Sequence, residues 1–166
     1  MQITFKKASF EDIEFINKIR NIYAKDFLHD SNVYSLEEAK IWFLNKNPDY
    51  YLIILNLNEK IGYFRTSNYS ADNKNIYIGA DLHPDYIGKN LAHESYNKFI
   101  DFIFKKYNLN KISLEVLSTN QRAIKLYKKL NFFIEGTKRQ EVIKNGQFVD
   151  SIVMSILKQD WKIKNE

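Results

Sequence analysis

Twenty residues, LEVLSTNQRAIKLYKKLNFF from Leu114 to Phe133, combine a short strand, a polar turn and an amphipathic helix. The strand is apolar except for one carboxylate, Glu115. The helix carries its apolar residues at helical spacing on one face: Ala123, Ile124, Tyr127 and Leu130. Because the turn is short, the helix must pack back against the sheet that contains the strand, with Tyr127 facing that sheet. We expect the chemistry of the protein in this segment.

Composition limits the chain to one folded unit. The sequence has 166 residues, of which 45% are apolar and 15% aromatic. This is enough for one well-buried core and too little for two. We therefore expect a single domain over residues 1–166, because neither a repeat nor a Pro-, Ser- or Gly-rich linker interrupts it.

The absence of cysteine excludes several kinds of chemistry. Without a thiol the chain forms no disulfide, no thiolate nucleophile and no sulfur-ligated metal site, and we expect no bound metal. The start MQITFKKASFEDI lacks the apolar centre and cleavage site of a signal peptide, and no run of eighteen apolar residues occurs. These features predict a cytoplasmic protein without a membrane partner.

The formal net charge is +5, a balance compatible with an anionic ligand. The lysines are scattered rather than gathered on one helix face, and no nucleic-acid recognition motif accompanies them. The sequence therefore predicts no nucleic-acid partner.

Hydrophobic periodicity predicts the element order β-α-α-β-β-β-α-β-α-β-β. This order gives an α+β (or α/β) fold with a mixed central sheet of about seven strands and about four helices. Ser9 with Asp12 and Ser35 with Glu38 have the capping-box spacing of helix starts. The first helix should bury the stripe Ile13, Ile16, Ile19, Ile22 and Tyr23. The other elements are expected at residues 2–8, 50–55, 61–65 and beyond, 75–83, 88–107, 112–117, 120–130, 132–143 and 148–157.

Two segments resemble the GNAT superfamily of acetyl-CoA-dependent N-acetyltransferases. They are NQRAIKLYKKLNFF, residues 120–133, which matches the family pattern closely, and HPDYIGKNLAHESYNKFI, residues 83–100, which matches it in part. The element order also resembles the fold of this family along nearly the whole chain. The most similar branches acetylate ribosomal proteins, amino sugars or polyamines. The resemblance therefore implies acetyl-CoA as co-substrate and a small-molecule amine as acceptor.

The resemblance places the coenzyme at the start of the long helix. In this family, backbone N–H groups of a loop at the helix N-terminus hold the pyrophosphate. Ile87 stands where the family has Arg or Gln, and Asn90 stands where it has Gly. The resemblance also implies that the backbone of Leu82 pairs with the pantetheine arm and that Asn120 caps the next helix and contacts the coenzyme. The residues that match the phosphate loop are Ile87, Gly88, Lys89, Asn90, Leu91 and Ala92.

The resemblance assigns Tyr127 as the acid that protonates the departing coenzyme A thiolate, a role that suits a phenol with an ordinary pKa of about 10. A core aromatic residue is the alternative interpretation. Three candidates are open for the base that accepts the proton of the amine: Glu115 first, then Asp81, then His83. Glu115 precedes Tyr127 by twelve residues, as in members that acetylate N-terminal amines. A salt bridge with a neighbouring strand explains Glu115 equally well, and a loop position explains His83.

The acceptor is less constrained, because the helices and loops that contact it vary freely in this fold. Arginine together with aromatic side chains favours an amino-sugar nucleotide. A protein N-terminal amine and a polyamine are the alternatives, and a non-catalytic coenzyme A sensor is the alternative from another class. We expect direct transfer in a ternary complex, by a monomer or a homodimer. The residues expected to contact the acceptor are Arg20, Asn21, Phe27, Tyr34, Arg65 and His83.

Overall fold

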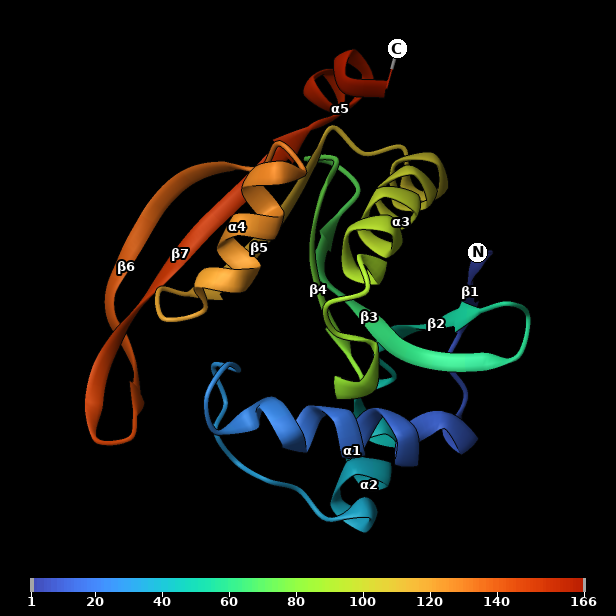
Figure 1. Ribbon diagram of the computed structural model, residues 1–166, viewed down its shortest axis with the longest axis vertical. Helices are drawn as coiled ribbons and strands as arrows, with labels where there is room; N and C mark the ends of the chain where they lie inside the picture. The colour runs from blue at the N-terminus through green and yellow to red at the C-terminus, as the bar shows by residue number, and fades with distance from the viewer. Residues whose placement is uncertain (1, 166) are drawn as a thin grey trace.

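The computed structural model describes residues 2–165, and for residues 162–165 it describes the backbone alone (Figure 1). These residues form one mixed sheet of seven strands, in the order β1-β2-β3-β4-β5-β7-β6, and five α-helices. The strands are β1 (Ile3–Lys7), β2 (Asp49–Leu55), β3 (Glu59–Ser70), β4 (Asn75–Leu82), β5 (Lys111–Leu117), β6 (Phe133–Lys144) and β7 (Gln147–Leu157). The helices are α1 (Ile13–Ala24), α2 (Leu36–Lys46), α3 (Leu91–Tyr107), α4 (Gln121–Lys129) and α5 (Lys158–Asn165). The predicted fold class and the predicted order of the first eleven elements are confirmed.

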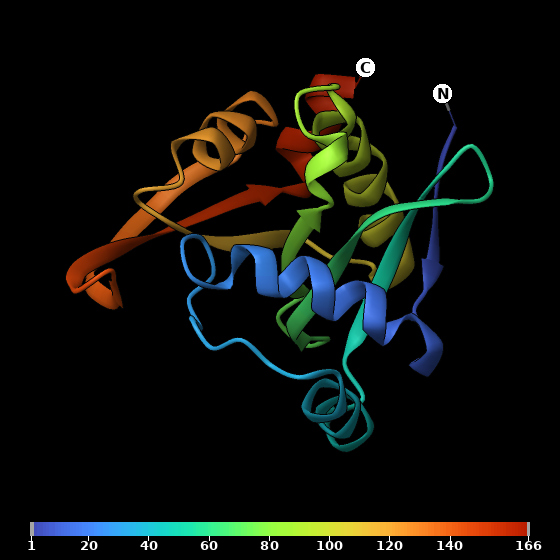
Figure 2. The same cartoon turned by 60° about the horizontal axis from the view of Figure 1, so that its bottom comes forward.

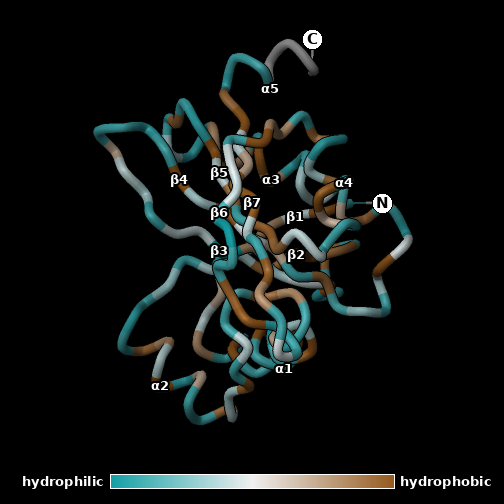
Figure 3. The backbone as a smooth tube through the Cα atoms, turned by 90° about the vertical axis from the view of Figure 1, so that its left-hand side faces the viewer, coloured by the Kyte–Doolittle hydropathy of each residue, from teal (hydrophilic) through white to brown (hydrophobic). Residues whose placement is uncertain are grey.

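The sheet separates two hydrophobic layers. On one face, α3 and α4 pack on a set of strand residues that includes Tyr51, Ile53 and Phe64. On the opposite face, α1 and α2 cover Leu52 and Ile54. Figure 2 shows α1 crossing in front of the sheet, and Figure 3 shows apolar stretches in the central strands and hydrophilic stretches in the outer loops. The division follows from the period of two in a strand, which sends successive side chains to opposite faces.

The parallel strands β4 and β5 diverge after a short contact. They pair at only three positions, Asn75–Tyr77 of β4 against residues 111–113 of β5. Beyond this contact, β4 continues to Leu82 and β5 to Leu117 without pairing with each other. The two strands separate between α3 and α4 (Figure 1). The carboxyl ends of separated parallel strands leave a gap, and such gaps are where open sheets bind ligands.

Two helices differ from the prediction. The sequence predicts the long helix from Gly88, but α3 begins at Leu91, because Gly88 and Asn90 have left-handed backbone angles with φ of 81° and 59°. Such residues cannot belong to a right-handed helix. The sequence did not predict α5, because KQDWKIKN has too few apolar residues to form a visible stripe. Its Trp161 packs into the core and donates to Asp101 at 2.6 Å.

The burial of α1 and α2 also corrects the predicted pattern. Four of the five predicted apolar residues of α1 are buried: Ile13, Ile16, Ile19 and Tyr23. Ile22 is 50% exposed, because at about 100° per residue it falls outside the arc of the other four. On α2, Ile41 and Trp42 are 54% and 45% exposed, since this helix makes most of its contacts with α1.

Candidate active site

A cavity of about 400 Å³ lies along the end of β4, beyond its contact with β5. Residues from α1 and the loop after it, β2, β4, the loop between β4 and α3, α3 itself and α4 line it. The cavity combines the predicted acid, one predicted base and most of the predicted coenzyme loop. The predicted site residues that line it are Phe27, Asp81, Leu82, Ile87, Gly88, Asn90, Ala92, Asn120 and Tyr127.

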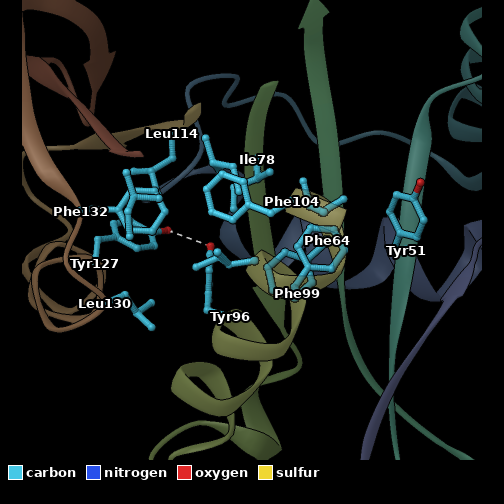
Figure 4. Packing of buried hydrophobic residues seen from close by; sticks show 14 of the residues in the cluster. Tyr51, Phe64, Ile78, Tyr96, Phe99, Phe104, Leu114, Tyr127, Leu130 and Phe132 are labelled. Atoms are coloured by element: carbon cyan, nitrogen blue, oxygen red, sulfur yellow. Dashed lines mark hydrogen bonds between the residues drawn. The ribbon is translucent and has the colours of Figure 1, made fainter. Parts of the chain in front are cut away.

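Tyr127, on α4, is buried in the wall of this cavity. Its hydroxyl lies 3.1 Å from the hydroxyl of Tyr96 on α3 (Figure 4). Burial raises the pKa of the Tyr127 phenol above its ordinary value, and burial raises the pKa of Tyr96 as well. Tyr127 is therefore protonated at neutral pH and has a proton to donate. Its ring also packs against Phe132, so a core position and an acid role are compatible.

The loop between β4 and α3 forms the end of the cavity where the coenzyme phosphates are predicted. Gly88 and Asn90 turn the chain sharply through their left-handed backbone angles. Asn90 is the N-cap of α3, but its side chain makes no capping hydrogen bond. The first backbone N–H groups of a helix lack partners within the helix, and together with the helix dipole they attract anions.

Two residues of the predicted loop, Lys89 and Leu91, do not line the cavity. Leu91 is 2% exposed and packs into the core, so it can contribute only its backbone. The Lys89 ammonium group lies 5.4 Å from the ring centre of Tyr86. Because Tyr86 lines the cavity, this ammonium group lies close to the cavity rim.

Asn90 stands where the family has glycine, and the backbone explains why the change is tolerated. Asn adopts a left-handed conformation more readily than other residues with a side chain. We expect Asn90→Ala to lower the free energy of unfolding by about 1 kcal/mol and to weaken acetyl-CoA binding, because the loop would leave its φ of 59°.

The matched control for this change is Asn90→Gly, which keeps the backbone angle accessible. It should retain both the melting temperature and the dissociation constant, measured by thermal unfolding and titration calorimetry. Equal losses in the two variants would show that the Asn90 side chain itself is needed.

The free edge of β4 offers backbone hydrogen bonds to the cavity. The N–H of His83 donates to Ile61 O of β3 at 2.8 Å, so the N–H and C=O of Leu82 face away from β3, toward the gap. Tyr23 of α1 donates its hydroxyl to Leu82 O at 2.7 Å. Leu82 therefore has the orientation that the family resemblance implies. Tyr23 is a cavity residue that the sequence pattern indicated only as part of a buried helix face.

The start of α4 contributes two polar side chains. Asn120 Oδ1 accepts from the N–H of Ala123 at 3.2 Å, which confirms its predicted position as the helix cap. Arg122 also lines the cavity. Among the described lining residues, Arg122 is the one arginine, and none is a lysine. Its guanidinium group suits a phosphate. Arg122 was not predicted, although its place inside the matched segment 120–133 could have indicated it.

Asp81 of β4 is held by two partners from β3. Its Oδ2 accepts from Tyr63 Oη and from Arg65 Nη1, each at 2.8 Å. Burial raises the pKa of Tyr63, and the Asp81 carboxylate raises it further. Arg65 crosses over Gly79, where any added Cβ would come within 2.8 Å of its guanidinium group. Arg65, predicted to contact the acceptor, is therefore positioned beside the cavity by its ion pair with Asp81.

Glu115 lies outside the cavity, on the part of β5 beyond its contact with β4. Its Oε1 accepts from Lys138 Nζ of β6 at 2.7 Å, and its Oε2 is 3.7 Å from His29 Nε2 in the loop between α1 and α2. Of the two interpretations open from the sequence, the salt bridge with a nearby strand is the arrangement found. The role of Glu115 as a base stays a prediction.

Three residues predicted to contact the acceptor instead fix the loop between α1 and α2. Arg20 donates to Asn32 O at 2.6 Å and to Asp30 Oδ2 at 2.7 Å, and it lies 4.6 Å from the ring centre of Tyr34. Asn21 Nδ2 donates to Tyr34 O at 2.7 Å. Arg20 and Tyr34 line a second cavity of about 480 Å³ that does not include Tyr127. Their position therefore does not support a role in acetyl transfer.

His83 precedes a short 3-10 turn and does not line the main cavity. Its Nδ1 lies 3.4 Å from the N–H of Asp85 and 3.5 Å from the Asp85 carboxylate, the geometry of a loop residue.

Among the described residues, no group of three or more His, Asp or Glu side chains is placed to hold a metal ion. Within the same part of the chain, no helix is long and apolar enough to cross a membrane.

Comparison with protein families identifies the class of protein to which this chain belongs. The chain belongs to the acetyltransferase (GNAT) family, whose model matches residues 16–132. That stretch contains every residue that lines the main cavity. Membership confirms the predicted N-acetyltransferase class, with acetyl-CoA as the co-substrate.

Individual relatives match over nearly the full chain. The uncharacterized N-acetyltransferase p20 of Bacillus licheniformis is 28% identical over 96% of this chain and 95% of its own. The spermidine N(1)-acetyltransferase of Vibrio cholerae is 25% identical over 99% and 98%. That of Escherichia coli K12 is 36% identical over 48% of this chain and 43% of its own.

Solved structures also match this chain over nearly its full length. A structure of the Vibrio cholerae spermidine N-acetyltransferase in complex with CoA and spermine has a TM-score of 0.90 at 23% identity, covering 97% of this chain and 98% of its own. A structure of the same Vibrio cholerae enzyme is dodecameric. At this level of identity, these matches confirm the fold.

Proposed function

We propose that the protein transfers an acetyl group from acetyl-CoA directly to a primary amine of a polyamine. The observation that carries the catalytic part is the buried Tyr127 hydroxyl in the wall of the cavity along the end of β4. The spermidine acetyltransferases among the relatives support a polyamine acceptor. The amino-sugar nucleotide expected from the sequence has no such support, since Arg20 and Tyr34, the arginine and aromatic pair that favoured it, lie in the other cavity.

Groups at two helix N-termini are suited to hold the coenzyme. The free N–H groups at the start of α3 and the Arg122 guanidinium of α4 would take its phosphates. The N–H and C=O of Leu82, which face the gap, would pair with the amide groups of its pantetheine arm. This arrangement directs the thioester inward, toward Tyr127.

The reaction requires a neutral amine and a proton for the leaving group. The amine nitrogen attacks the thioester carbonyl carbon, so that a C–N bond forms and the C–S bond breaks. Tyr127 gives its proton to the departing sulfur, and the surplus proton of the amine passes to a base on the acceptor side. The transfer is direct, since the chain has no cysteine to carry an acetyl group.

The charges beside the gap are compatible with a cationic acceptor. Asp81 and Glu115 are carboxylates on the two diverging strands, and each pairs with one cation, Arg65 or Lys138. The ammonium group of a polyamine could replace the Lys138 ammonium group beside Glu115 without changing the local charge. Lys138 is 43% exposed, so moving its side chain into water costs little.

A thiol-release assay with a panel of acceptors tests this proposal. The panel contains spermidine, spermine, amino-sugar nucleotides, free amino acids and short peptides. We expect the highest kcat/KM for spermidine or spermine. A higher value for another class would overturn the polyamine assignment, and binding of acetyl-CoA without turnover of any acceptor would favour the coenzyme A sensor.

A further inference from the structure

Four side chains from distant parts of the chain meet next to the gap, outside the main cavity. They are His29 from the loop between α1 and α2, Glu115 from β5, Lys138 from β6 and Ser151 from β7. His29 Nε2 lies 2.7 Å from Ser151 Oγ and 3.7 Å from Glu115 Oε2. Lys138 Nζ donates to the other Glu115 oxygen at 2.7 Å. Sequence patterns did not indicate His29, because it is an isolated histidine in a polar loop.

The position of Glu115 places this cluster on the face of the sheet opposite α3 and α4. Leu114 and Val116 pack into the core that α3 and α4 cover, so Glu115 between them faces the opposite side. Glu115 also lies beyond Ser113, the last residue of β5 that pairs with β4. The cluster therefore borders the gap on the face that α1 covers, opposite the helices that would hold the coenzyme.

The loop that carries His29 is anchored to both sides of the gap. Phe27, two residues before His29, lines the main cavity. At the other side, Lys144 Nζ of β6 donates to Ala24 O at 2.9 Å and to Ser31 Oγ at 2.6 Å. His29 is thus held between the cavity wall and the β6–β7 hairpin, and 37% of its side chain is exposed to an incoming molecule.

The partial burial of the imidazole favours its neutral form. Burial lowers the pKa of His29, and Arg65 and Lys138 act in the same direction, while Glu115 and Glu141 act against them. The Glu115 carboxylate, 3.7 Å from Nε2, favours the tautomer in which Nε2 carries the proton and donates to Ser151 Oγ. In this tautomer the other ring nitrogen, Nδ1, carries the lone pair. A neutral imidazole with a free lone pair can accept a proton at neutral pH.

We propose that His29 is the base of the reaction and that Glu115 is its positioning residue. Nδ1 of His29 accepts the proton that the acceptor ammonium group releases, directly or through one water. The N–H bond of the ammonium group breaks, an N–H bond forms on the imidazole, and the freed lone pair attacks the thioester carbonyl carbon. As the C–S bond breaks, the nitrogen loses a second proton, which replaces the one that Tyr127 gives to the sulfur. Glu115 and Ser151 stabilise the imidazolium, which then returns its proton to solvent. This assignment rests on the proposed acetyl transfer to an amine, whichever amine is the acceptor.

The pH dependence of kcat/KM tests the assignment on the intact enzyme. In the wild type, the rate should fall as the pH drops through the pKa of His29. His29→Asn should lower kcat about 100-fold near neutral pH and abolish this acid limb, with an unchanged dissociation constant for acetyl-CoA. Glu115→Gln should move the limb to lower pH, and Lys138→Met should move it to higher pH. A wild-type profile in His29→Asn would overturn the proposal.

Ser151→Ala separates a base from a simple loop anchor. It removes the hydroxyl that fixes the imidazole at 2.7 Å but leaves the imidazole in place. The variant should keep the acid limb even where its rate is reduced. Loss of the limb in Ser151→Ala to the same extent as in His29→Asn would reduce His29 to an anchor.

Titration of the histidine rings by NMR gives a readout that needs no acceptor. The chain has three histidines, so the His29 signal is assigned by its loss in His29→Asn. We expect its pKa below about 6.5 in the wild type and lower still in Glu115→Gln. A pKa above that value, or one that Glu115→Gln leaves unchanged, would overturn the proposed roles of His29 and Glu115. This result does not depend on whether any acceptor in the panel is acetylated. Failure of all acceptors together with the expected titration would instead contradict the proposed function alone.

Discussion

Tyr127→Phe should lower kcat about 100- to 1,000-fold while the dissociation constant for acetyl-CoA stays nearly constant. The change removes one oxygen from a buried ring and keeps the packing against Phe132. The departing thiolate then lacks a positioned proton donor, which affects the transition state and not the ground state. Steady-state kinetics and titration calorimetry on the same preparation separate the two effects. An unchanged kcat would show that Tyr127 is only a core residue.

Tyr96→Phe is the matched control for this change. It removes the hydroxyl that lies 3.1 Å from Tyr127 but leaves the proposed acid in place. The loss of kcat should be much smaller than in Tyr127→Phe, because Tyr96 would only orient the donor. Equal losses in the two variants would indicate that the proton passes through both hydroxyls.

Phe99→Ala should lower the free energy of unfolding by about 3–5 kcal/mol. Phe99 is fully buried on α3 and stacks on Phe64 at 3.8 Å between ring centres (Figure 4). Its ring also lies 5.1 Å from the ring of Phe5. Its removal leaves a cavity where α3 packs on the sheet, and the rigid rings around it cannot collapse into that space. Urea unfolding followed by circular dichroism measures the loss.

Phe133→Ala is the control for the loss of an aromatic ring. Phe133 is 64% exposed at the start of β6, so its truncation should change the free energy of unfolding by no more than about 0.5 kcal/mol. A loss comparable to that of Phe99→Ala would mean that Phe133 is covered in solution, for example by a second copy of the chain.

The order of elements could be predicted because its signals are local. The capping boxes at Ser9 and Ser35 are both present, and Asn145-Gly146, a local signal for a tight hairpin turn, joins β6 to β7. The separation of β4 and β5 has no such local signal. It depends on which strands pair and in what register, and these strands are far apart along the chain. The family resemblance implied only that the backbone of Leu82 is available to the coenzyme.

The same distinction holds for the site. Tyr127 and Asn120 belong to one contiguous segment, so their spacing could be recognised in the sequence. His29 meets Ser151 across 122 residues of chain, and no pattern along the sequence records such a contact. Arg20 and Tyr34 were misplaced for a related reason, since an arginine beside an aromatic residue looks the same whether it binds a ligand or fixes a loop.

The short pairing between β4 and β5 divides the sheet into a block of four strands and a block of three. A molecule bound along the free edge of β4 would add hydrogen bonds across this division and make the ligand part of the sheet. Ligand at a hundred times its dissociation constant stabilises a folded protein by about 2.7 kcal/mol. Here that gain should be concentrated at the division, so amide hydrogens of β4 and β5 should exchange most slowly when acetyl-CoA is bound. The bound coenzyme would then hold the two blocks of the sheet together in addition to supplying the acetyl group.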